Sequence, residues 1–381
     1  MFKLTANLNL DKMLMSGRRR WMEMEGNMKL LYLIHVDWNW IFQRPQIIEL
    51  QLEKDFNCTV INRKFLLKKE LKNKNPYPQK MINIYQFPKE YKFKLIKCIN
   101  KIIFKLCVRN IKSYDYIWIT SPLLYDLIPY NYKGKVIYDC MDNHVSMASN
   151  YMKKKISEQE KKLINRADYI FASSIKLIET IPGLSNAHLL RNGYIYQEPK
   201  PVQVPKKKET YVISYFGTIS SWFDFQLLEH SCKKFQNIEY HLIGPEEKAL
   251  AINKNQLSSN IIFEGVVQHD KLYKKISNDD ALIMPFKIND IILSVDPVKL
   301  YEYICFGKCI ISVWYPEIDR FEPFVYFYRN EQEYFDLLSD LSIKGFPAKY
   351  DTLQQKNFLY KNTWDKRYDQ IMHVLKNTKD D

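Results

Sequence analysis

The sequence predicts an α/β protein of two doubly wound domains, each with a parallel sheet covered by helices. Short apolar, β-branched runs alternate with amphipathic segments along most of the 381 residues, which is typical of such sheets. The chain is also longer than one hydrophobic core usually sustains. The stretch EPKPVQVPKKKE at 198–209 interrupts the alternation and is rich in proline and lysine, as linkers are.

The first half of the chain, residues 28–197, is expected to form one domain. Its apolar runs suit buried strands, and its segments with one apolar side suit helices. Residues 1–27 show neither pattern and are expected to be a disordered N-terminal extension. In chain order we expect a strand at 30–36, a helix at 44–54, strands at 58–62, 116–120 and 135–140, a helix at 158–166 and a strand at 169–172.

The second half, residues 210–355, repeats the pattern and is expected to form the other domain. We expect strands at 211–216, 239–243, 261–264, 281–285 and 309–313, with helices at 224–235, at 269–277 and from 297 onward. Two such domains joined by a linker enclose a cleft, and parallel sheets bind ligands at the carboxyl ends of their strands. The cleft is therefore the expected active site.

The stretch DPVKLYEYICFGKCIIS predicts a helix that runs into a strand. Asp296 is expected to cap the helix, Pro297 to take its first position and Gly307 to end it. Lys299 and Glu302, three residues apart, then share one face near the positive end of the helix dipole. They form either a solvated ion pair or part of a ligand site.

Composition narrows the possible partners. The net charge of +14 favours phosphate-bearing partners: nucleic acid, anionic lipid or a charged substrate. Nucleic acid is disfavoured because the basic residues are dispersed and no reading motif accompanies them. The seven cysteines include no Cys-x-x-Cys pair, which indicates free thiols in a reducing compartment and no zinc site. No apolar run is long enough to span a bilayer, so we expect a cytoplasmic protein.

Motifs at the strand ends point to a nucleotide. The first strand is followed by HVDWNWIFQRP, which lacks the glycines of a dinucleotide fingerprint, and a P-loop is absent, so no nicotinamide or flavin cofactor is expected. In the second half a strand ends at Gly217-Thr218, a turn suited to an anion. Together with the helix that begins near Pro297, this turn would hold a nucleotide diphosphate. Lys299 would supply positive charge and Glu302 would accept hydrogen bonds from a ribose diol.

A set of further motifs follows one order along the chain. They are IHVDWNWIFQRPQ at 34–46, VIYDCMDNH at 136–144, RADYIFASS at 166–174, RNG at 191–193, YFGTISSWFDFQLLE at 215–229, FEGVV at 263–267, IMP at 283–285 and the block at 296–312. Their order and spacing resemble GT-B glycosyltransferases of the group 1 type, in the branch with teichuronic-acid and related polysaccharide transferases. The resemblance runs from Lys29 onward. It implies two Rossmann-like domains, an acceptor site in the first and a donor site in the second.

On the donor side the resemblance carries over residue by residue. Glu302 matches the second glutamate of a paired-glutamate motif and would hold the ribose. Ser294 stands eight residues earlier, where many relatives have a glutamate that contacts the sugar, and Asp296 is expected to substitute in part. Gly265, Val266 and Val267 match the loop that contacts the base through its backbone.

The resemblance also implies which residue neutralises the leaving diphosphate and to which domain the C-terminal helix returns. Thr218 follows Gly217 where many relatives have a basic residue, so Lys299 becomes the group expected to neutralise the leaving diphosphate. Residues 356–381 are expected to form a helix that returns to the first domain.

On the acceptor side the candidates follow the strand at 135–140. Asp139, Asp142 and His144 are expected to include a base that removes the acceptor proton in an inverting reaction; a retaining reaction needs none. The alternative for each is a helix-capping aspartate or a structural histidine. Asp37 and Arg44 would orient an anionic acceptor. Trp38 would stack on its sugar unless, like most aromatic residues, it only packs.

Residues 92–112 predict the clearest amphipathic helix of the chain. Lys97, Lys101, Lys105 and Arg109 form one stripe, and apolar residues populate the other side. The helix either lies on anionic lipid or is an ordinary domain helix with a lysine-rich outer face.

The sequence therefore predicts a metal-independent and cofactor-free glycosyltransferase with a nucleotide-diphosphate sugar, a UDP-sugar, as donor. The acceptor is expected to be a hydroxyl of a cell-surface polysaccharide or lipid-linked precursor, and the protein to work at the inner face of the plasma membrane. The alternative is a catalytically silent subunit that binds sugar nucleotides or serves in assembly.

Overall fold

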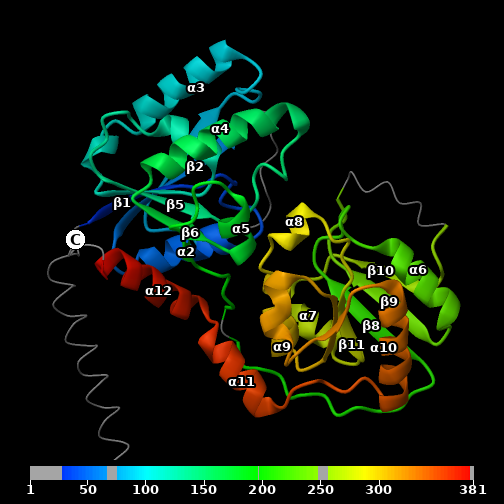
Figure 1. Cartoon of the computed structure of the whole chain (residues 1–381). Helices are drawn as coiled ribbons and strands as arrows, with labels where there is room; N and C mark the ends of the chain where they lie inside the picture. Colours follow the sequence, from blue (N-terminus) through cyan, green and yellow to red (C-terminus); the bar gives the residue numbers. More distant parts are fainter. Residues whose placement is uncertain (1–27, 67–74, 196, 248–255, 378–381) are drawn as a thin grey trace, which may run out of the picture. The chain divides into compact units, whose positions relative to one another are not determined.

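The computed structural model describes residues 28–66, 75–195, 197–247 and 256–377, and the expected extension at 1–27 lies outside them. These residues divide into two compact units (Figure 1). Unit 1 runs to Ser173 and adds Leu177–Leu190 and the chain from Tyr368. Unit 2 comprises Ser174–Lys176 and Arg191–Arg367.

Unit 1 is built on a parallel sheet of order β3-β2-β1-β4-β5-β6-β7. Its inner strands are buried on both faces because helices flank the sheet. The strands are β1 (Lys29–Leu33), β2 (Asn57–Phe65), β3 (Met81–Gln86), β4 (Tyr116–Ile119), β5 (Lys135–Cys140), β6 (Tyr169–Ala172) and β7 (His188–Leu189). The helices are α2 (Arg44–Leu52), α3 (Lys94–Cys107), α4 (Asn150–Arg166), α5 (Ile175–Thr180) and the 3-10 turns η1 (Ile111–Ser113) and η2 (Pro122–Leu127).

Unit 2 has a second parallel sheet, of order β10-β9-β8-β11-β12-β13. Its strands are β8 (Tyr211–Phe216), β9 (Ile238–Ile243), β10 (Ile261–Gly265), β11 (Ala281–Met284), β12 (Cys309–Val313) and β13 (Tyr326–Tyr328). The helices are α6 (Phe225–Lys234), α7 (His269–Ile276), α8 (Asp290–Leu293), α9 (Val298–Cys305), η4 (Pro316–Phe321), α10 (Glu331–Lys344) and α11 (Thr352–Lys361). Helix α12 (Trp364–Asn377) begins with unit 2 and belongs to unit 1 from Tyr368 onward.

The predicted doubly wound fold is confirmed in both units. Each sheet contains one point where neighbouring strands are not consecutive and the winding reverses, between β1 and β4 in unit 1 and between β8 and β11 in unit 2. Loops that leave such a pair of strands part in opposite directions, and the carboxyl ends of the two strands become the natural place for a ligand.

Helix α9 differs from its prediction at one end. It begins at Val298 after an N-cap at Pro297, so the expected cap by Asp296 is wrong. Asp296 instead accepts the backbone N–H of Asn192 at 2.6 Å and pairs with Arg320. At the other end Gly307 has φ +69° and stops the helix as predicted.

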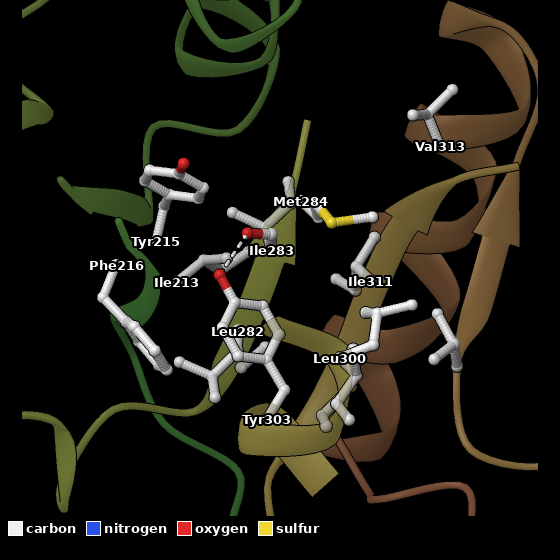
Figure 2. Packing of buried hydrophobic residues seen from close by; sticks show 14 of the residues in the cluster. Ile213, Tyr215, Phe216, Leu282, Ile283, Met284, Leu300, Tyr303, Ile311 and Val313 are labelled. Carbon is white, nitrogen blue, oxygen red and sulfur yellow. Dashed lines mark hydrogen bonds between the residues drawn. The ribbon is translucent and has the colours of Figure 1, made fainter. Parts of the chain in front are cut away.

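The core of unit 2 fixes the position of α9 on its sheet (Figure 2). Leu300 and Tyr303 are fully buried, and the Tyr303 hydroxyl donates to the backbone carbonyl of Ile283 in β11 at 3.0 Å. Because these side chains anchor one face of the helix, Lys299 and Glu302, which each directly precede one of them in the sequence, remain only half-buried.

Candidate functional site

Three neighbouring strands of unit 2 end on glycines that have positive φ. Gly217 follows β8 with φ +139°, Gly244 follows β9 with φ +144°, and Gly265 ends β10 with φ +71°. The Gly217 N–H donates to Ile243 O at 2.9 Å, and the Gly244 N–H donates to Gly265 O at 2.8 Å. Side chains are thus absent from three adjacent positions, and the carboxyl edge of the sheet presents bare backbone there.

The packing of this glycine edge is too close for side chains at two of the positions. A Cβ on Gly244 would lie 2.0 Å from the carbonyl oxygen of Gly217. A Cβ on Gly217 would lie 2.0 Å from Cε and 2.7 Å from Nζ of Lys299. Sequence reasoning singled out Gly217 and Gly265 but missed Gly244, although the Gly-Pro that follows the expected strand at 239–243 was a usable signal.

Lys299 therefore lies directly over the end of β8, on the first turn of α9. Its Nζ is 5.9 Å from the centre of the Tyr215 ring. Loss of water around the side chain lowers the pKa of Lys299, and the negative charge of Glu302 opposes this shift. The structure thus brings together Gly217, Lys299 and Glu302, which were predicted from separate parts of the chain. A partly desolvated ammonium beside bare backbone is suited to an anionic ligand.

The other predicted donor residues lie in two settings. Val266 and Val267 follow Gly265, and Val266 is 73% exposed. Thr218 uses its carbonyl to accept the Tyr215 hydroxyl at 2.8 Å. In contrast, Ser294 is buried and its hydroxyl donates to Asp290 O at 2.9 Å.

Asp296 is 1% exposed, and its carboxylate is occupied by Arg320 and by the Asn192 N–H. The burial of Ser294 and Asp296 argues against direct contact of these side chains with a donor sugar. The chain offers no signal for this in sequence, because Asn192 and Arg320 are distant from Asp296 along the chain.

In unit 1, two histidines meet at the reversal of the sheet. His35 follows β1, His144 follows β5, and their ring centres are 5.8 Å apart in an edge-on arrangement. Thr120, the residue after β4, holds both of them: its hydroxyl contacts His35 Nδ1 at 2.8 Å, and its backbone bonds to His144. His35 was not singled out from the sequence, since a lone histidine after a strand carries no motif.

The hydrogen bonds of Thr120 bear on the tautomer of His35. The Thr120 hydroxyl donates to Leu33 O at 3.2 Å and accepts the His35 backbone N–H at 3.0 Å. When its single proton is used in this way, the hydroxyl accepts from His35 Nδ1 as well, and Nδ1 carries the ring proton. Nε2 of this exposed residue is left with its lone pair, as a general base requires.

The electrostatics keep both imidazoles neutral near pH 7. The groups packed around His35 remove part of its water, although its outer edge stays exposed, and this lowers its pKa to about 4; His144 lowers the pKa as well, and Asp142 opposes the shift. Burial lowers the pKa of His144 to about 4. Burial raises the pKa of Asp142, opposed by His35 and Arg44 and assisted by Asp139. A positive charge that develops on His35 would be stabilised by the Asp142 carboxylate.

Arg44 and Asp139 form a buried ion pair beneath these residues. Arg44 Nη2 lies 2.6 Å from Asp139 Oδ1, and Arg44 Nη1 donates to Leu190 O at 2.8 Å. Asp139 is fully buried and Arg44 is 5% exposed. Both side chains are thus occupied inside unit 1, which argues for a structural role rather than for proton transfer by Asp139 or acceptor binding by Arg44.

The remaining acceptor candidates lie in the loop after β1. Trp38 is fully buried, and its indole N–H donates to Pro76 O at 2.9 Å, so it offers no face to a sugar. Asp37 is half-buried and accepts the Asn39 N–H at 2.9 Å. In the part of the chain that the structure describes, no three His, Cys, Asp or Glu side chains gather as metal ligands would.

Comparisons with known proteins relate the chain to glycosyltransferases. No family model matches it. It is 25% identical over 236 residues to the putative teichuronic acid biosynthesis glycosyltransferase TuaH of Bacillus subtilis, a match that covers 56% of this chain and 59% of that protein.

Among solved structures it resembles a sucrose-phosphate synthase from Thermosynechococcus elongatus, with a TM-score of 0.70 and 12% identity over 92% of this chain and 99% of that one. It also resembles Anabaena HepE in complex with UDP and glucose, with a TM-score of 0.65 and 12% identity over 92% of this chain and 100% of that one. The chain therefore has the GT-B fold, with two Rossmann-like units, and resembles the glycosyltransferases that share it.

Proposed function

We propose that the protein is a glycosyltransferase that moves a sugar from a UDP-sugar to a hydroxyl group of a cell-surface polysaccharide or lipid-linked glycan precursor. The observation that carries the proposal is the Lys299 ammonium over the bare backbone at Gly217. Support also comes from the likeness to HepE, whose structure contains UDP and glucose, and to the teichuronic acid glycosyltransferase.

On the donor side, the diphosphate lies against the glycine edge. Lys299 offsets the charge that grows on the leaving diphosphate as the sugar–phosphate bond breaks, which is the step where electrostatic stabilisation counts most. Glu302, one turn further along α9, accepts hydrogen bonds from the ribose hydroxyls. Residues 265–267 contact the base through their backbone. No metal ion and no cofactor take part.

On the acceptor side, His35 Nε2 takes the proton of the attacking hydroxyl in an inverting reaction. His35 is neutral above pH 4, and Asp142 stabilises the imidazolium that forms. Thr120 holds the ring in the productive tautomer. In a retaining reaction the same group would bind the acceptor hydroxyl without removing its proton beforehand. The reaction is placed in the cytoplasm because free thiols suit a reducing compartment.

The test is transfer from a panel of UDP-sugars, followed by mass spectrometry of the products. Lys299→Met and Glu302→Gln should each reduce transfer and UDP affinity with the fold retained. Lys344→Met is the matched control, since Lys344 pairs with Asp340 on the exposed side of α10. Full transfer by both site variants would refute the assignment. UDP-sugar binding without transfer or hydrolysis would favour the alternative, a silent sugar-nucleotide-binding subunit.

A further inference from the structure

Helix α3 of unit 1 buries polar atoms and exposes apolar ones. Its buried side chains are Asn100 and Phe104, at 1% and 3% exposure. Asn100 anchors the helix: its amide donates to Phe87 O and to Glu90 Oε2, both at 2.9 Å, and accepts the Phe87 N–H at 2.9 Å. Phe104 is buried and Ile103 packs against the core beside this polar anchor, while a second set of apolar side chains on the helix faces away from the core.

The outward stripe is formed by Leu95, Ile102 and Leu106, which are 73%, 58% and 61% exposed. Spacings of seven and four residues place them on one line along the helix. Phe93, just before the helix, is 53% exposed and adds a further exposed apolar side chain. Figure 1 shows α3 on the outside of unit 1, beside α4. We call these four residues the α3 apolar face. An ordinary domain helix would bury such a face instead.

A row of basic residues runs beside the α3 apolar face. Residues 91–112 contain seven lysines and arginines and neither Asp nor Glu. Lys97 is paired with Asp126, whereas Lys94, Lys105 and Arg109 are exposed and Lys101 is half-buried. An apolar stripe beside a cationic row is the arrangement that matches the boundary between acyl chains and phosphate headgroups.

We propose that α3 lies in the surface of an anionic phospholipid bilayer, with the α3 apolar face among the acyl chains and the basic row on the lipid phosphates. A second copy of the chain fits less well, since two such faces would bring two cationic rows together. The surface of an anionic bilayer can bind the α3 apolar face through its acyl chains and the basic row through its phosphates. None of the described helices is long and apolar enough to cross a membrane.

Vesicle co-sedimentation of the whole chain tests the proposal without donor or acceptor, so its outcome is independent of the transfer reaction. Binding is expected to vesicles that contain phosphatidylglycerol and to be weak on phosphatidylcholine alone. Leu95→Ser with Leu106→Ser should weaken binding at least about tenfold. Lys101→Gln with Lys105→Gln should weaken it about fivefold per charge. Leu353→Ser on α11, at a residue that is 68% exposed, is the matched control and should bind as the parent does.

A fluorophore on Cys98 reports insertion directly. Cys98 and Cys107 are the exposed thiols and the other five are buried, so Cys107→Ser leaves one labelling site on α3. A blue shift on phosphatidylglycerol vesicles, absent with Leu95→Ser and Leu106→Ser, supports the proposal. Unchanged vesicle binding by the leucine variant overturns it. The proposal is also overturned if the lysine variant loses vesicle binding while the leucine variant keeps it. It is likewise overturned if the parent chain forms a dimer and the leucine substitutions make that dimer dissociate.

Discussion

Substitution of Gly217 by alanine separates the ligand role of Lys299 from the stability of unit 2. At φ +139° an L-residue is strained by about 1–3 kcal/mol. The new methyl group would also lie 2.0 Å from Lys299 Cε, and this long side chain yields more easily than backbone does. The ammonium is therefore displaced from the glycine edge. Loss of its contact with a diphosphate, worth about 1.5–3 kcal/mol, should weaken UDP binding about 10- to 150-fold.

Two other glycines make the comparison sharp. Gly183→Ala in unit 1 carries a similar strain at φ +90°, but its methyl group meets only an Ile164 methyl carbon at 3.0 Å; it should lose stability and keep UDP affinity. Gly244→Ala would lie 2.0 Å from the backbone oxygen of Gly217, which cannot rotate away. Its unfolding free energy should therefore fall furthest, by more than about 4 kcal/mol.

Isothermal titration calorimetry with UDP and urea unfolding of each variant supply the two readouts. A double variant tests the cause: in a Lys299→Ala background the ammonium is already gone, so Gly217→Ala should weaken UDP binding no further. If Gly217→Ala binds UDP as the parent does, or if its effect persists undiminished without Lys299, the proposed role of the ammonium is refuted.

Three further predictions concern unit 1. Glu49 is fully buried, its carboxyl oxygens have no hydrogen-bond partner among the described residues, and burial raises its pKa to about 9, with Glu53 adding to the rise. The folded state then holds a proton that the unfolded chain releases near pH 4.5, so this stabilisation is complete below that pH and is lost as pH rises toward 9. Glu49→Gln should therefore reduce the change of the urea unfolding midpoint with pH over this range. An unchanged pH dependence of the midpoint would contradict the assignment. Asp139→Asn should cost about 3–5 kcal/mol of unfolding free energy because it leaves Arg44 buried without its counter-charge, whereas a well-folded but inactive variant would restore Asp139 as a catalytic candidate. His35→Gln should slow transfer about 100-fold or more with UDP affinity unchanged by calorimetry, and a transfer rate within a few-fold of the parent would exclude His35 as the base.

The sequence by itself determined the two doubly wound units. Buried parallel strands need continuous apolar runs and their connecting helices need one apolar side. Each strand and helix can therefore be recognised from its own stretch of sequence. The end of α9 at Gly307 was equally local. The edge strand β3, the short β13 and helices α10 and α11 were not anticipated, because half-exposed elements carry weaker patterns.

The candidate sites depended more on tertiary structure. Lys299 and Gly217 could each be proposed from local motifs, but their close approach requires α9 to be anchored on the sheet by Leu300 and Tyr303. The pairing of Arg44 with Asp139, and of Asp296 with Arg320, joins distant segments and turned expected site residues into internal ion pairs. His35 became a candidate base only when the structure placed its ring against Thr120. The outward turn of α3 was decided by the inward hydrogen bonds of Asn100, which periodicity cannot reveal, because an amphipathic pattern does not say which of its sides meets the core.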